Sequence, residues 1–161
     1  MDNVSSFPLS TSLTLSELMY PDGIYQLIYS ICFLHPLHII LAFYYEMYLS
    51  CWMGVTLFIT SLNYWKKPIK NSLARTIDTI CVHLIIPYQY YLSLFTTNKL
   101  LCTGLLTVGI LMYPLSNYYY KENMKLSALC HCGLHMFLSI GLCCMYNNYY
   151  EEQITSKFLI R

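Results

Sequence analysis

Hydrophobic residues fall into five long runs that are separated by short polar segments. The runs cover residues 23–45, 48–65, 77–95, 100–118 and 127–146. A helix needs about 20 mostly apolar residues to cross a bilayer, and each run reaches or approaches that length. The pattern therefore predicts an all-α fold, a polytopic membrane bundle of about five transmembrane helices with short loops.

The break between the first two runs is the weakest boundary, because neither Gly nor Pro marks it. Only Glu46 and Met47 interrupt the stretch from 23 to 65. That stretch is too long for one crossing, so we predict a tight helical hairpin with Glu46 in the headgroup region. The predicted organisation is a cytoplasmic or interfacial arm, a five-span bundle and a short C-terminal tail, at residues 1–22, 23–147 and 148–161.

Composition supports an integral membrane protein. Hydrophobic residues make up 57% of the chain and charged residues only 11%, whereas a soluble domain carries about 25% charged residues. The net charge of +1 provides no basic field for nucleic acid. The chain also lacks a glycine-rich phosphate loop. The expected surroundings are therefore a lipid bilayer, and no nucleic-acid partner is expected.

Basic residues predict how the bundle is oriented. They gather in the connections after the second and fourth runs, as Lys66, Lys67, Lys70, Arg75, Lys121 and Lys125. With five crossings these two connections share a side, and the positive-inside rule assigns that side to the cytoplasm. The N-terminus is then expected in the cytoplasm and the C-terminus on the lumenal or external side.

A set of polar residues interrupts the apolar runs at one depth. His131 and His135 are four residues apart and project from one face of a helix. Such groups are costly in a bilayer, so they usually face the bundle interior and often mark function. At about 1.5 Å of rise per residue, Ser61 and Asp78 lie within roughly 15 Å of the same cytoplasmic end. His83 is level with His135.

The chemistry that this set permits is metal binding. Neutral imidazole and carboxylate suit Zn²⁺, and three protein ligands plus water leave a reactive position open. The candidate ligands are His131, His135, Asp78 and His83. Asp78 is also a candidate catalytic base, and Ser61 is expected to hydrogen-bond a ligand or an oxyanion. The structural alternative is that the histidines bond a neighbouring helix and that Asp78 pairs with Arg75.

A second polar cluster, His35-Pro36-Leu37-His38, lies near the middle of the first run. Pro36 removes a helical hydrogen bond and can kink the helix. One interpretation makes the two histidines a proton or ligand site. The other makes them partners for the carbonyl groups that the kink frees.

The polar positions resemble the pattern of the CREST superfamily, the membrane hydrolases related to alkaline ceramidases and to adiponectin and progestin receptors. That pattern has Ser-x3-His late in one span, Asp early in the next and His-x3-His in the last. Ser61–Trp65 stands in place of the first motif, Asp78 is similar to the second, and His131–His135 is similar to the third. The resemblance implies a zinc-dependent hydrolase that cleaves lipid amides or esters.

Two features depart from the CREST pattern. Trp65 occupies the position of the first zinc histidine, and the family has seven spans whereas this chain shows five. His83 lies about 140° around its helix from Asp78, so it requires a different geometry to replace the missing ligand.

Three functional hypotheses therefore remain open. The first is a divergent CREST-like hydrolase with a lipid substrate, or an inactive relative of one. The second is a non-catalytic subunit of a viral or organellar membrane complex, with other membrane subunits or further copies of the chain as partners. The third is a channel or proton carrier that uses His35, His38 and His83.

Overall fold

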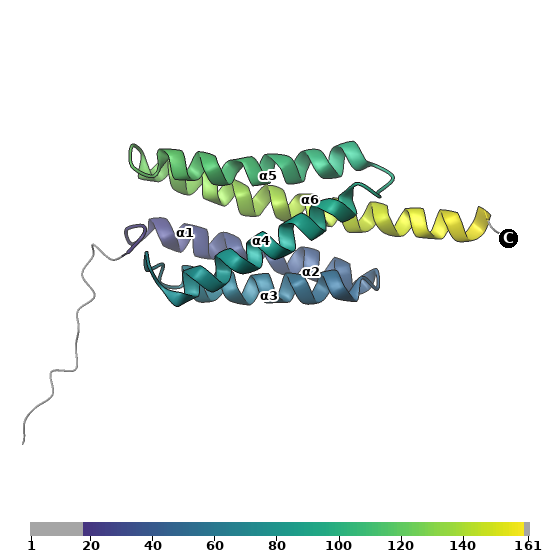
Figure 1. Cartoon of the computed structure of the whole chain (residues 1–161), viewed down its shortest axis with the longest axis horizontal. Helices are drawn as coiled ribbons and strands as arrows, with labels where there is room; N and C mark the ends of the chain where they lie inside the picture. The colour runs from purple at the N-terminus through teal and green to yellow at the C-terminus, as the bar shows by residue number, and fades with distance from the viewer. Residues whose placement is uncertain (1–17, 160–161) are drawn as a thin grey trace, which may run out of the picture.

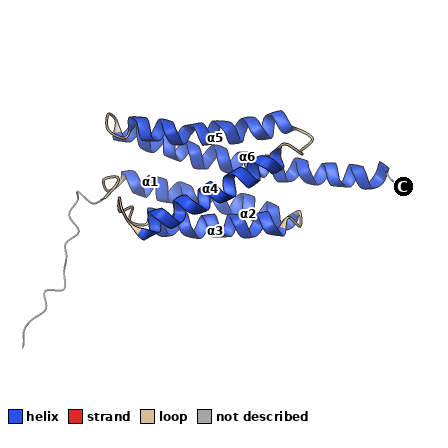
Figure 2. Cartoon of the chain, in the orientation of Figure 1, coloured by secondary structure: helices blue, strands red, loops and turns tan. Residues whose placement is uncertain are grey.

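The computed structural model describes residues 18–159, and side chains through residue 149. Within this part the chain is all-helical and has no strand (Figure 2), so the predicted all-α fold is confirmed. The helices are α1 (Ile24–Ile31), the 3₁₀ turn η2 (Cys32–Leu34), α2 (His35–Tyr44), α3 (Tyr48–Trp65), α4 (Leu73–Ser93), α5 (Lys99–Tyr119) and α6 (Met124–Leu159).

Among the described residues, three helical segments are long and apolar enough to cross a membrane. They are Ile24–Tyr44, Lys99–Tyr119 and Met124–Tyr149. The first of these joins α1 to α2 through η2, and Pro36 lies in the first turn of α2. The chain is therefore compatible with a membrane protein, and crossing by α3 and α4 as well stays a prediction.

The helical hairpin predicted at Glu46 is confirmed. Helix α2 ends at Tyr44, α3 begins at Tyr48, and Glu46 turns the chain with a φ of 60°. Successive helices then run back and forth, so that the α3–α4 and α5–α6 connections lie at the same end of the bundle (Figure 1). The orientation argument needs these two connections on one side. Which side that is stays a prediction.

The last helix does not end where its apolar run ends. Helix α6 contains 36 residues, which is about 54 Å at 1.5 Å per residue, and the hydrocarbon core of a bilayer is only about 30 Å thick. Its C-terminal part projects past the other helices (Figure 1). The predicted short tail at 148–161 is thus helical through Leu159. Polar residues end the apolar run, but the helix continues because Glu, Gln and Lys are good helix formers.

The predicted N-terminal arm is fixed where the structure describes it. Residues 1–17 lie outside the described part. The Met19 N–H donates to the Pro68 carbonyl at 2.7 Å, and the hydroxyls of Tyr20 and Ser127 lie 2.7 Å apart. The end of the arm therefore packs against the α3–α4 connection and the start of α6.

Two apolar clusters enclose the polar residues. The cluster nearer the arm is Tyr20, Ile28, Cys32, Tyr64, Trp65 and Ala128. The second contains Ala42, Leu57, Ile85, Leu106, Leu138, Leu142 and Met145. Along their helices His35, Ser61 and His135 fall between members of the two clusters. The polar layer therefore lies inside the bundle with apolar packing on both sides.

Two glycines let α5 and α6 form the most extensive helix pair of the bundle. A Cβ on Gly109 would lie 2.9 Å from Cγ of Leu138 and 3.1 Å from its backbone N. A Cβ on Gly141 would lie 2.9 Å from Cδ2 of Leu106. Small residues at such positions allow close backbone approach between membrane helices.

Gly109→Val should therefore destabilise the bundle. The added side chain overpacks the α5–α6 contact, and we expect a loss of about 1–3 kcal/mol in unfolding free energy. Gly104→Val is the matched control, because a Cβ at Gly104 meets nothing within 4 Å. Thermal unfolding in detergent, followed by circular dichroism, compares the two variants. Equal midpoints would contradict the close packing at Gly109.

Candidate functional site

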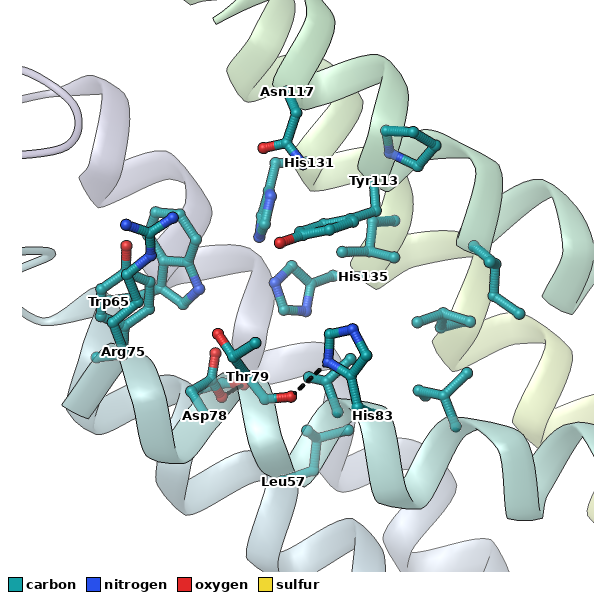
Figure 3. Close-up of a pocket in the computed structure, with 18 of the residues that line it drawn as sticks. Leu57, Trp65, Arg75, Asp78, Thr79, His83, Tyr113, Asn117, His131 and His135 are labelled. Atoms are coloured by element: carbon teal, nitrogen blue, oxygen red, sulfur yellow. Dashed lines mark hydrogen bonds between the residues drawn. The ribbon is translucent and has the colours of Figure 1, made fainter. Parts of the chain in front are cut away.

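A cavity of about 550 Å³ lies among α3, α4, α5 and α6 (Figure 3). Most of its wall is apolar. Its polar lining residues are His35, Ser61, Tyr64, Arg75, Asp78, Thr79, His83, Tyr90, Tyr113, Asn117, His131 and His135. The structure thus brings the predicted metal and catalytic residues, Ser61, Asp78, His83, His131 and His135, to the wall of one cavity, whereas His38 does not line it.

Asp78 is anchored by hydroxyl groups. The Ser61 hydroxyl donates to Oδ1 of Asp78 at 2.7 Å, and the Thr60 hydroxyl donates to the same oxygen at 3.1 Å. Among the described residues no ion pair joins Asp78 to Arg75, although the structural alternative predicted one. The Arg75 guanidinium donates to the Lys70 carbonyl at 2.6 Å. The carboxylate therefore joins α4 to α3 through neutral donors.

Three histidines form a hydrogen-bonded chain between α2 and α6. Nδ1 of His35 lies 3.0 Å from Nε2 of His38, and Nε2 of His35 lies 3.1 Å from Nδ1 of His135. All three side chains are buried. The interpretation that His35 and His38 satisfy kink carbonyls is therefore wrong. Sequence reasoning missed the contact because its partners are 100 positions apart, and no local pattern relates them.

His131 lies against Trp65 rather than joining this chain. Their ring centroids are 4.6 Å apart, and those of His131 and His135 are 5.2 Å apart. Trp65 is buried at 2% exposure, and its ring fills the space beside His131. His83 is exposed, and its Nδ1–H donates to the Thr79 carbonyl on its own helix at 2.7 Å (Figure 3).

The donor groups as arranged do not fit zinc. In residues 18–149 no group of three or more His, Cys, Asp or Glu side chains is placed to hold a metal ion. A zinc site needs at least three protein ligands, yet both ring nitrogens of His35 and Nδ1 of His135 are already bonded. Zinc binding by His131, His135, Asp78 and His83 stays a prediction.

Comparison with known proteins leaves the family open. No protein-family model matches the chain, and no curated protein or solved structure matches it. The resemblance to the CREST superfamily stays a prediction that rests on the motif residues. The cavity adds to it one observation, that residues of all three motifs line the same space.

Ser61→Ala should destabilise the bundle through Asp78. The change leaves the buried carboxylate with Thr60 as its remaining hydroxyl donor, and hydrogen bonds to charged groups contribute about 1.5–3 kcal/mol. Thr56→Ala is the control on the same helix, because its exposed hydroxyl bonds only the Trp52 carbonyl. Thermal midpoints in detergent should fall for Ser61→Ala alone. Equal shifts would mean that Asp78 does not depend on Ser61.

Proposed function

We propose that this multi-pass membrane protein binds one lipid amide or ester in the cavity, as a divergent relative of the CREST hydrolases. The observation that carries the proposal is an apolar cavity with a hydroxyl-bonded carboxylate and imidazole groups in its wall. Ligand pockets combine mostly apolar walls with a few polar groups that fix orientation. An acyl chain suits the apolar wall, and its carbonyl group suits the region around Ser61, Asp78 and His135.

Exposed lining residues support access to the cavity from the bilayer. His83 and Pro87 on α4 line the cavity and are exposed, as are Leu111 and Tyr113 on α5. The cavity therefore reaches the surface along the seam between these helices. In a bilayer this seam faces lipid, so a ligand can enter sideways without crossing water.

The site also carries groups for hydrolysis. Both hydroxyl bonds to Asp78 go to Oδ1, so Oδ2 is the oxygen positioned to accept from a water molecule or a ligand. Asp78 is the candidate general base for a water that attacks the carbonyl. Trp65 favours the second candidate function, a non-catalytic subunit, because its ring against His131 fills the space of the missing CREST ligand. In that case the cavity binds lipid without turnover.

Binding is tested with a fluorescent C16 acyl ester and the purified chain in detergent micelles. Val82→Trp places a large ring in the cavity wall, and we expect affinity to fall at least about tenfold, which is 1.4 kcal/mol. Ile80→Trp is the matched control, because Ile80 lies on the same helix, is 53% exposed and does not line the cavity. Absence of binding by the unaltered chain, or equal losses in both variants, would overturn the proposal.

The same ester distinguishes hydrolysis from binding alone. Mass spectrometry measures release of the fatty acid over time. Turnover that is lost in Asp78→Asn, while that variant still binds the ester, assigns the hydrolase. Binding without turnover assigns the non-catalytic function and ends the case for Asp78 as a base.

A further inference from the structure

The chain of three histidines has a hydrogen-bond direction that Cys32 sets. The Cys32 thiol donates to the Ile28 carbonyl at 3.3 Å. Its sulfur lies 4.0 Å from Nε2 of His135, and a thiol that has already donated its proton can only accept there. A neutral imidazole has one N–H donor and one acceptor nitrogen. His135 therefore carries its proton on Nε2 and accepts on Nδ1.

The direction then passes from ring to ring. Nε2–H of His35 donates to Nδ1 of His135 at 3.1 Å, and Nε2–H of His38 donates to Nδ1 of His35 at 3.0 Å. The chain ends at Nδ1 of His38, which is buried and has no hydrogen-bond partner among the described residues. An unpaired acceptor there agrees with this direction, because orphaned buried N–H groups are the rarer case.

The packing around His38 makes room for its ring. A Cβ on Gly54 of α3 would lie 3.2 Å from Cε1 of His38 and 2.8 Å from Cγ1 of Ile39. Gly54 therefore allows α2 and α3 to approach with the imidazole between them. His38 is 1% exposed, so its ring is confined by its neighbours and this end of the row of histidines is held in place.

We propose that His38 and His35 are positioning residues that hold His135 as a neutral imidazole whose Nε2–H donates to the carbonyl oxygen of the bound ligand. His135 lines the cavity, and its Nε2 has the Cys32 sulfur at 4.0 Å as a partner. Sulfur is a weak acceptor, so a carbonyl oxygen readily replaces it. The identity of the ligand rests on the proposed lipid function, whereas the direction of the chain does not.

This role differs from the metal ligand that the sequence pattern predicts. A metal bound by His135 needs a nitrogen with a free lone pair. Nδ1 of His135 uses its lone pair for His35, and Nε2 carries the proton. The same residue can therefore serve as a hydrogen-bond donor or as a zinc ligand, and the histidine chain selects the first.

Nuclear magnetic resonance of the full chain, labelled with ¹⁵N-histidine in micelles, reads the tautomers directly. We expect a proton on Nε2 of His38, His35 and His135. His38→Gln keeps an amide donor near the Nε2 position and should keep the tautomers of the other two rings. His38→Leu removes the donor to Nδ1 of His35, so the signal of that nitrogen should shift and the His35 ring should lose its fixed orientation, whereas the proton on Nε2 of His135 stays. Identical spectra for the Gln and Leu variants would reduce His38 to a packing role and overturn the proposal.

Ligand binding tests the donor itself. The probes are a C16 acyl ester and the matching ether, which differ only in the carbonyl oxygen. His135→Phe and His38→Leu should weaken ester binding about two- to tenfold, the worth of one neutral hydrogen bond, and leave ether binding unchanged. His38→Gln should restore ester binding.

Two results would overturn the proposal. One is a proton on Nδ1 of His135, and the other is equal weakening of the ester and the ether. If the unaltered chain binds neither probe, the proposed lipid function fails together with the carbonyl contact. The tautomer spectra still decide the direction of the histidine chain in that case, so the two failures are distinguishable.

Discussion

The hydrogen bond between His35 and His135 joins α2 to α6, in the first and last of the segments that are long and apolar enough to cross a membrane, and the rest of the polar centre is arranged around it. An imidazole without a partner is costly in an apolar interior, so histidines on α2 and α6 favour the approach of these helices. Apolar clusters on both sides of the bond lower the local dielectric, which strengthens the bond and raises the cost of breaking it.

The cavity lies where helices that pack on different partners meet. Gly109 and Gly141 allow α5 to pack closely against α6, whereas the hydrogen bond between Ser61 and Asp78 joins α3 to α4. The cavity wall holds His131 and His135 on the α6 side and Asp78 on the α4 side. A ligand in this space would contact both pairs, so binding and the stability of the bundle should be coupled.

The sequence predicted the depth of the polar residues in the bundle better than it predicted which residues contact one another. A rise of about 1.5 Å per residue was enough to place Ser61, Asp78 and His135 at one depth, and the structure places all three at one cavity. The hairpin at Glu46 followed from the length of the apolar stretch. Depth does not say which helices touch, so the contact between His35 and His135 was missed. The apolar pattern also predicted where the apolar run within α6 ends. It did not predict the end of the helix, which continues to Leu159.

The coupling between the two nitrogens tests the central bond most directly. A scalar coupling passes through an N–H···N hydrogen bond, so it connects Nε2 of His35 to Nδ1 of His135 only if the bond exists. For the whole protein labelled with ¹⁵N-histidine in micelles, this account predicts a resolved coupling between these two nitrogens. The coupling is lost in His35→Leu. Sharp signals from both rings without any coupling would contradict the bond and the organisation of the polar centre described above.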